Sequence, residues 1–231
     1  MRRLSILIPV FNEEKTIAEI LTAVDQIKLT HWNKEIIIID DGSRDKTQEM
    51  VAQLKKTIPV KLIIHPKNMG KGKAIQSGMK VAKGEYILIQ DADLEYSPSD
   101  IPRLLEPIEE GIAQVVYGTR LKRLPNLKRD ERTPRFFLHY LGNRSLSLLV
   151  SLLYRHRLTD IETGYKLFPK KAVKSMKLIS RGFEFEPEIT IKLLKSGYRI
   201  HEVSIQTNPR GYDTGKKLQT IPDGLKALRM I

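Results

Sequence analysis

Short continuous apolar runs alternate with amphipathic segments along the first half of the chain. Runs such as 4–10 and 86–89 are apolar at nearly every position, which is typical of a strand covered on both faces of a parallel sheet. In the segments between them the apolar residues recur at helical spacing. The pattern predicts strands at 4–10, 35–41, 60–64, 85–90 and 114–117, and helices at 13–27, 43–54, 71–82 and 98–110. This order predicts an α/β fold with a doubly wound, mostly parallel sheet flanked by helices.

The second half is less regular. Residues 120–135 hold seven Lys or Arg, two acids and two prolines, and predict a loop. A helix is expected at 136–158, another at 186–196 and a strand at 200–207, followed by a basic loop at 208–217 and a short helix. No repeat or linker interrupts the chain, so we expect a single domain over 1–231.

The helix predicted at 136–158 has two interpretations. Its Phe, Tyr and Leu residues could form an apolar face that docks, beside the arginines of the preceding loop, on an anionic membrane surface. Alternatively the helix packs on the sheet, which we favour for most of its residues. The residues concerned are Phe136, Phe137, Tyr140, Leu141, Leu148, Leu149, Leu152 and Leu153.

Composition narrows the possible functions. The chain has 231 residues, no cysteine and a net charge of +13, which suits phosphorylated ligands or an anionic membrane. Nucleic acid is not expected as a partner, because the sequence has no helix-turn-helix, zinc-finger or RNP-like pattern. No apolar run approaches the roughly 20 residues of a membrane span, so we expect a cytoplasmic protein that is peripheral on the membrane.

The strand predicted at 85–90 runs directly into Asp91, Ala92 and Asp93. Ligands of open α/β sheets bind beyond the carboxyl ends of the strands. Carboxylates two residues apart on extended backbone point to the same side and can converge on one hard cation. Mg²⁺ and Mn²⁺ are held by few carboxylates together with substrate phosphates. The segment therefore predicts a metal–diphosphate site, against the alternative of two solvated acids in a loop.

Three further segments at predicted strand ends or helix starts carry candidate ligand groups. Pro9, Phe11, Asn12 and Glu13 follow the first strand, and Asn12 could cap the next helix. Asp40 and Asp41 end the second strand, where adjacent acids need partners such as ribose hydroxyls or base N–H groups; a helix cap would also explain them. Lys71 lies between two glycines at a helix start. That segment matches neither a P-loop nor the dinucleotide-binding fingerprint.

Taken together, these segments resemble family 2 glycosyltransferases, whose fold is a nucleotide-sugar-binding (GT-A-like) α/β domain. The second half resembles the branch of dolichol-phosphate mannose synthases and bacterial polyprenyl-phosphate hexosyltransferases. The segments that carry this likeness are 158–168, 182–188 and 209–217. The resemblance implies a nucleotide-binding half at 1–118 and an acceptor-side half at 119–231, with the basic loop 120–135.

The resemblance also implies roles for individual residues. The nucleoside pocket would be lined by Pro9, Phe11, Asn12, Glu13, Asp40 and Asp41. Asp91 and Asp93 would bind Mg²⁺ or Mn²⁺ on the donor diphosphate, with Glu95 as a third ligand or a sugar contact. Lys71, Ala92, Arg120, Arg210 and Lys216 would complete the nucleotide-sugar site. Where much of the branch has Thr-Cys, this chain has Thr163-Gly164.

The implied reaction is the inverting transfer of a hexose, mannose or glucose, from a GDP- or UDP-sugar to a polyprenyl (dolichyl or undecaprenyl) phosphate. A phosphate monoester is already a nucleophile at neutral pH, because its second pKa is about 6. Asp160 lies where hydroxyl-accepting relatives place a general base, so it could be a base, an orienting partner of Arg or Lys, or a helix cap. The alternatives are transfer to a sugar hydroxyl with Asp160 as the base, nucleotidyl transfer, or a nucleotide-sugar-binding scaffold. Many relatives carry membrane helices after this domain, and a separate membrane-anchoring partner is one way to replace them.

Overall fold

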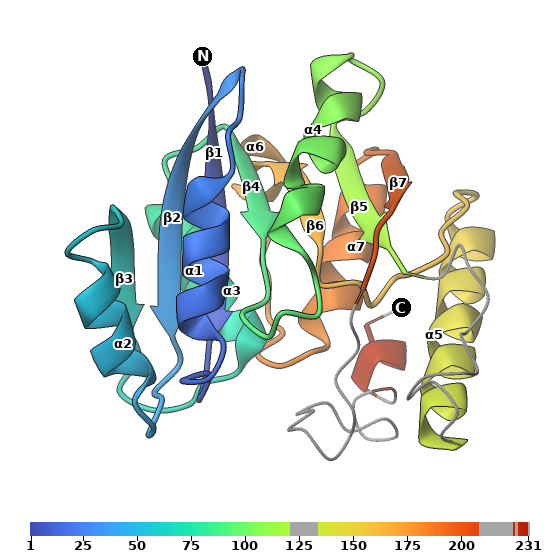
Figure 1. The fold of residues 1–231 in the computed structure, drawn as a ribbon. Helices are drawn as coiled ribbons and strands as arrows, with labels where there is room; N and C mark the ends of the chain where they lie inside the picture. The colour runs from blue at the N-terminus through green and yellow to red at the C-terminus, as the bar shows by residue number, and fades with distance from the viewer. Residues whose placement is uncertain (121–133, 208–223, 225, 231) are drawn as a thin grey trace.

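The computed structural model describes residues 1–120, 134–207, 224 and 226–230 (Figure 1). Its seven strands form one sheet in the order β3-β2-β1-β4-β6-β5-β7. The strands are β1 (Arg2–Val10), β2 (Trp32–Asp40), β3 (Val60–Ile64), β4 (Tyr86–Ile89), β5 (Val115–Thr119), β6 (Lys166–Pro169) and β7 (Ile200–Ser204). All neighbouring pairs are parallel except those of β6, which is antiparallel to both β4 and β5. The prediction of a mostly parallel sheet flanked by helices is confirmed.

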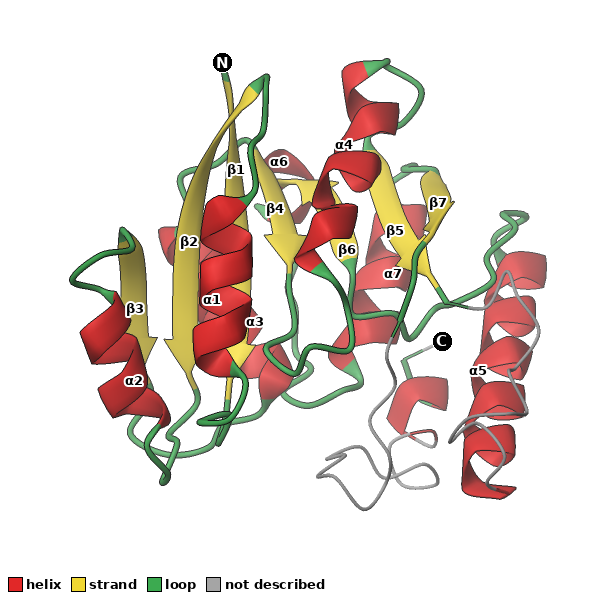
Figure 2. Cartoon of the chain, in the orientation of Figure 1, coloured by secondary structure: helices red, strands yellow, loops and turns green. Residues whose placement is uncertain are grey.

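Helices cover both faces of the sheet, as Figure 2 shows. They are α1 (Ile17–Gln26), α2 (Thr47–Leu54), α3 (Lys71–Val81), α4 (Ile101–Glu109), α5 (Pro134–Leu153), α6 (Lys170–Val173) and α7 (Phe185–Lys195), with a short 3₁₀ helix at Pro98–Asp100. Apolar residues of α1, α2 and α4 belong to one core cluster, and those of α3, α6 and α7 belong to the other. The sheet is therefore the middle layer of three.

Strand β1 shows why its sequence is apolar throughout. Its residues alternate between the two core clusters: Leu4, Ile6 and Ile8 face α1 and α4, whereas Leu7 faces α3. The same alternation occurs in β2. A strand with helices on both faces needs apolar side chains at odd and even positions alike. A continuous apolar run therefore predicts such a strand correctly.

Strand β6 and the short helix α6 that follows it are elements that the sequence analysis missed. Strand β6 is the one that changes the topology of the sheet. It is four residues long, and it begins with Lys166, whose side chain is fully buried. Neither a period-2 alternation nor a long apolar run marks it. It lies between β4 and β5 and so separates the two groups of parallel strands.

Helix α5 departs from expectation in its bounds and its packing. It spans 134–153 rather than 136–158, and it stands at one side of the molecule in Figure 1. The interpretation that it packs its leucines on the sheet is wrong for Leu141, Leu148, Leu149, Leu152 and Leu153, which are exposed. Among the described residues, no helix combines the length and the hydropathy needed to span a membrane.

Candidate active site

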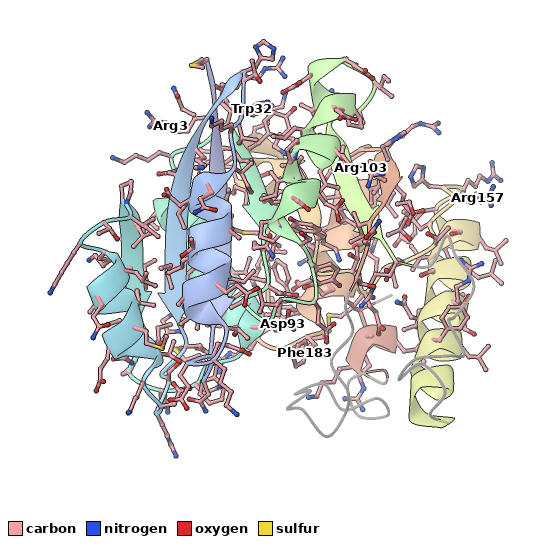
Figure 3. All side chains as sticks on the ribbon, viewed as in Figure 1. Arg3, Trp32, Asp93, Arg103, Arg157 and Phe183 are labelled. Atoms are coloured by element: carbon pink, nitrogen blue, oxygen red, sulfur yellow. The ribbon has the colours of Figure 1, made fainter. Side chains whose placement is uncertain are left out.

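The candidate residues gather at the carboxyl ends of the parallel strands. Strands β1, β2, β4 and β5 point the same way, so the residues that follow them emerge at one edge of the sheet. Figure 3 labels Asp93 at this edge. This is the edge at which open α/β sheets bind ligands.

Asp40 presents an unused acceptor at this edge. One carboxylate oxygen, Oδ1, accepts hydrogen bonds from the backbone N–H groups of Gly42 (3.0 Å) and Ser43 (2.8 Å) and from the side chain of Gln48 (3.1 Å). The other oxygen, Oδ2, is buried and has no hydrogen-bond partner among the described residues. A buried carboxylate oxygen without a donor is costly, so it fits a ligand N–H or hydroxyl group.

Asp41, by contrast, is engaged by the protein itself. Its carboxylate lies 2.7 Å from Nδ1 of His65 and accepts the backbone N–H groups of Met69 (2.9 Å) and Gly70 (2.7 Å). His65 in turn contacts the hydroxyl of Ser77 at 2.9 Å. Asp41 therefore fastens the loop that leads into α3.

The loop after β1 is joined to the loop after β2. Asn12 has a φ of 52°, donates its N–H to Ser43 Oγ (2.9 Å), and accepts the N–H of Arg44 on Oδ1 (2.8 Å). Helix α1 begins only at Ile17, so the expectation that Asn12 caps this helix is wrong; helix α2 likewise begins only at Thr47, four residues after Ser43.

The other residues of the loop after β1 lie at the same contact between the two loops. Buried Glu13 donates its N–H to Thr47 Oγ1 at 2.9 Å. Pro9 and Phe11 lie half-buried at the end of β1. The two loops together form one wall of the site, beside Asp40.

Asp91 is held by a lysine from α3. Lys71 Nζ lies 2.7 Å from Asp91 Oδ1 and 2.9 Å from Oδ2. The same ammonium is 3.0 Å from Glu186 Oε1, and Glu186 Oε2 is 2.8 Å from Nζ of buried Lys166. Four charged groups of alternating sign therefore run from the strand end into the interior, which is how buried charges remain ionised.

The pKa values follow from this chain of charges. Burial alone would lower the pKa of Lys71, but Asp91 and Glu186 outweigh it and raise the pKa above its ordinary value. Burial would raise the pKa of Glu186, but Lys166 and Lys71 lower it. For Lys166 burial dominates, so its pKa is lowered although Glu186 opposes the shift.

Asp93 lies among other acids. Burial, with the charges of Asp91 and Glu95, raises the pKa of Asp93 to about 7. Glu95 donates its backbone N–H to Asp93 Oδ1 at 3.1 Å, across a turn in which Leu94 has a φ of 62°. Ala92 points the other way and packs in the core. A bound cation would lower the repulsion that neighbouring acids exert on the Asp93 carboxylate.

Arg120, the first residue after β5, is oriented by Asp160. Its backbone N–H (3.1 Å) and Nε (2.7 Å) donate to Asp160 Oδ2, and its Nη2 donates to Oδ1 (2.7 Å). Asn143 of α5 donates a further bond to Oδ1 at 2.7 Å. Burial would raise the pKa of Asp160, but Arg120 and Asn143 keep it below its ordinary value. An acid with four donors and a lowered pKa is a poor proton acceptor.

Comparison with known proteins identifies this arrangement. Residues 5–176 match the family described as Glycosyl transferase family 2. The chain belongs to glycosyl transferase family 2. Its fold is that of a family 2 nucleotide-sugar enzyme, and the identification made from the sequence motifs is confirmed.

Two curated relatives in this family are similar over most of the chain. A dolichol-phosphate mannosyltransferase of Pyrococcus furiosus is 31% identical over 82% of this chain and 53% of its own length. A dolichyl-phosphate beta-glucosyltransferase of Trichomonas vaginalis is 31% identical over 89% of this chain and 65% of its own length. The chain thus spans about half to two thirds of the length of these two relatives.

A solved structure supports the fold. The glucosyl-3-phosphoglycerate synthase of Mycobacterium tuberculosis, in a complex with Mn²⁺, UDP and phosphoglyceric acid, aligns with a TM-score of 0.71 and 20% identity. The alignment covers 92% of this chain and 72% of that one.

Asp91 and Asp93, at the end of β4, are candidate ligands for a divalent cation. Burial and the neighbouring acids raise the pKa of Asp93, whereas Asp91 forms an ion pair with Lys71. Among the described residues no group of three His, Cys, Asp or Glu side chains converges closely enough to hold a metal ion, and the role of Glu95 as a third ligand or a sugar contact stays a prediction. Two carboxylates are enough for Mg²⁺ or Mn²⁺ when a ligand's phosphates supply the rest.

Sequence reasoning missed several residues of the site. Glu186 lies on helix α7, as the helix predicted at 186–196 implies, but the sequence did not indicate that it contacts both Lys71 and Lys166. Lys166 carried one signal, since a lysine between Tyr165 and Leu167 in an apolar stretch needs a buried acid. The sequence around Asn143 contains no such signal, because a helix sequence does not indicate which distant acid its asparagine will contact. Arg210 and Lys216 lie outside the described residues.

Proposed function

We propose that this protein transfers a hexose, mannose or glucose, from a GDP- or UDP-sugar to a polyprenyl phosphate. The observation that carries the proposal is the Arg120–Asp160 pair. The acid at the position of a general base is occupied by four donors, and its partner is a guanidinium at the edge of the site. Such a pair suits an acceptor that brings its own anionic nucleophile.

The donor half is supported by groups at the ends of β2 and β4. The unpartnered Oδ2 of Asp40 can accept a hydrogen bond from the ribose or base of the nucleoside. Asp91 and Asp93 would hold Mg²⁺ or Mn²⁺, which neutralises charge on the departing diphosphate. Lys71, beside Asp91, adds a cation to the same region.

The chemical step is a single displacement. An oxygen of the acceptor phosphate attacks the anomeric carbon from the face opposite the diphosphate. The new carbon–oxygen bond forms as the bond to the diphosphate breaks, so the configuration is inverted. Arg120 binds the acceptor phosphate and holds it in line, which is catalysis by orientation and charge.

The names of the relatives support this acceptor. Two proteins at 31% identity are named for dolichyl phosphate, one as a mannosyltransferase and one as a glucosyltransferase. Their names differ in the sugar, so the hexose is to be decided by experiment.

The test is transfer of radiolabelled sugar from a panel of GDP- and UDP-hexoses into lipid that partitions into organic solvent. The assay contains Mn²⁺ or Mg²⁺ and dolichyl or undecaprenyl phosphate. We expect label in the lipid with one donor, and its loss in Asp93→Asn and Arg120→Gln. If donor binds in calorimetry but label enters only a hydroxyl acceptor, the polyprenyl phosphate assignment is wrong.

A further inference from the structure

Helix α5 buries polar residues toward the protein. Asn143 and Ser147 are 3% and 1% exposed, and each contacts the segment 158–161. Asn143 donates to Asp160, Ser147 Oγ accepts the N–H of Ile161 (3.0 Å), and Ser151 Oγ accepts the N–H of Leu158 (2.9 Å). This face of α5 is therefore fixed by hydrogen bonds, with Val150 as its buried apolar contact.

The opposite face of α5 is a stripe of leucines. Leu148, Leu152 and Leu153 are 61%, 69% and 59% exposed. With Leu141 and Leu149 they recur at spacings of three, four and seven, which places them on one side of a helix. We call these five residues the leucine stripe. They are half of the ten large apolar side chains that are exposed in the described part of the chain.

This distribution is the reverse of that in an ordinary surface helix, in which the apolar side faces the core. A contiguous apolar stripe left in water marks a surface that meets another apolar phase. The hydrogen bonds of Asn143, Ser147 and Ser151 fix the rotation of α5 about its own axis. A rotation that turned the leucines toward the core would break these bonds.

The charges beside the stripe indicate what that phase is. From 134 to 159 the sequence contains no acidic residue. Arg144 on α5 and Arg155 and Arg157 just after it are exposed, and Figure 3 shows Arg157 pointing outward at this side of the molecule. Arginines that flank a leucine stripe match a surface of anionic headgroups over an acyl layer. Protein interfaces instead rely on aromatic anchors, and leucine is under-represented among their hot spots.

We propose that the leucine stripe of α5 docks on an anionic lipid bilayer, which brings Arg120, held behind the helix, to within a helix diameter (~10 Å) of the membrane surface. The connection is short: Asn143, on the face opposite the stripe, donates to Asp160, which holds Arg120 by three hydrogen bonds. The inference rests on the proposed function for its purpose, since a polyprenyl phosphate presents its headgroup at a bilayer surface. The docking itself is independent of the reaction.

The experiment is co-sedimentation of the whole chain with vesicles that contain no polyprenyl phosphate. One set is phosphatidylcholine alone, and the other is phosphatidylcholine with phosphatidylglycerol. We expect binding to the anionic vesicles that weakens as salt is raised. Leu148→Ser with Leu152→Ser should reduce the partition coefficient about tenfold or more, because two exposed leucines no longer enter the acyl layer.

The matched control is Ile112→Ser. Ile112 is 64% exposed, close to the 69% of Leu152, but it lies in the turn between α4 and β5, away from α5. Single Leu152→Ser and Ile112→Ser variants remove similar exposed apolar groups, so only the former should weaken vesicle binding. Circular dichroism and donor binding by calorimetry verify that each variant is folded.

Three outcomes would overturn the proposal. These are no binding of the wild type to anionic vesicles, equal loss in Leu152→Ser and Ile112→Ser, or a stripe that holds two copies together. The last is detected by sedimentation velocity as a wild-type dimer that becomes monomeric in the double variant without binding vesicles. Because the vesicles carry no acceptor, a failure of sugar transfer leaves these results unaffected.

Discussion

At the scale of single residues, the site is defined by which carboxylate oxygens are already occupied. Asp160 and Asp41 accept hydrogen bonds on both oxygens, whereas Asp40 accepts on only one and keeps Oδ2 buried without a partner among the described residues. Adjacent acids such as Asp40 and Asp41 look alike in the sequence. Their different roles depend on His65 and on the loop at 69–70, which lie 24 or more residues away.

Replacing Asp160 by Asn tests whether it orients Arg120 or removes a proton. The change leaves Arg120 without its charged partner, so we expect a loss of stability of roughly 2–4 kcal/mol. We also expect a higher KM for the acceptor with turnover largely kept. Steady-state kinetics with a polyprenyl phosphate and chemical denaturation provide the two measurements. A folded variant with unchanged KM and no turnover would instead identify Asp160 as a base.

The buried carboxyl group of Glu162 predicts that the stability of the protein depends on pH. Burial, with Asp160 and Glu186 opposing the effect of Arg120 and Lys166, raises the pKa of Glu162 to about 7 from an ordinary 4.5. The folded state then binds the proton more tightly than the unfolded state, so this residue's contribution to stability falls as pH rises from 4.5 to 7. Glu162→Gln should stabilise the protein at pH 8 by about 3 kcal/mol at most and have little effect at pH 4.5.

Denaturation with urea at both pH values measures this difference. Exposed Glu110→Gln is the control and should show no change between them. Equal effects of Glu162→Gln at pH 4.5 and pH 8 would contradict the prediction.

At the scale of elements, the close approach of α3 to the segment before α7 positions Lys71 and Glu186. A Cβ on Gly72 would lie 2.8 Å from Phe185 Cβ and 2.8 Å from the carbonyl oxygen of Ser180. Gln76 of the same helix also donates to the carbonyl of Ser180 at 2.6 Å. Glycine at 72 therefore allows α3, which carries Lys71, to approach the start of α7, which carries Glu186.

Gly72→Ala should destabilise the protein by about 1–3 kcal/mol, because the added methyl group overpacks this contact. Gly142→Ala is the matched control: it is also a helical glycine, but nothing lies within 4 Å of its Cβ position. Since alanine favours a helix by up to about 1 kcal/mol over glycine, Gly142→Ala should be neutral or stabilising. Thermal unfolding of the two variants decides; equal destabilisation would refute the packing argument.

Some of these elements could be predicted from the sequence and others could not. Strands β1 and β2 were predictable because helices on both faces require apolar residues at every position. Strand β6 was not, since four residues that begin with a buried lysine carry no periodic signal. The face of α5 was misjudged for a physical reason: periodicity separates two faces of a helix, and only tertiary contacts such as Asn143–Asp160 decide which one is inside.

At the scale of the whole molecule, the candidate active site spans the ends of several strands that are far apart in the sequence. Asp40 ends β2, Asp91 follows β4 and Lys71 begins α3, and the ion pair between Lys71 and Asp91 joins two of these segments. Ligands that bind only the assembled site stabilise the folded state by mass action.

A nucleoside diphosphate with Mn²⁺ should therefore raise the melting temperature. At a concentration of 100 times Kd the expected gain is about 2.7 kcal/mol. Asp93→Asn should lose most of this gain, whereas control Asp25→Asn, on α1 and away from the strand ends, should retain it. Differential scanning fluorimetry with and without EDTA measures both. A full shift in Asp93→Asn would exclude this residue as a metal ligand.

The ion pair between Lys71 and Asp91 has a consequence for how the protein is made. Because Lys71 lies between Asp91 and Glu186, two of the acids at the site have a positive neighbour before any ligand arrives. A newly synthesised chain can thus complete its sheet in a compartment where divalent ions are scarce. The folding of the chain and the binding of a ligand are then separate events, because these ion pairs need no ligand to form.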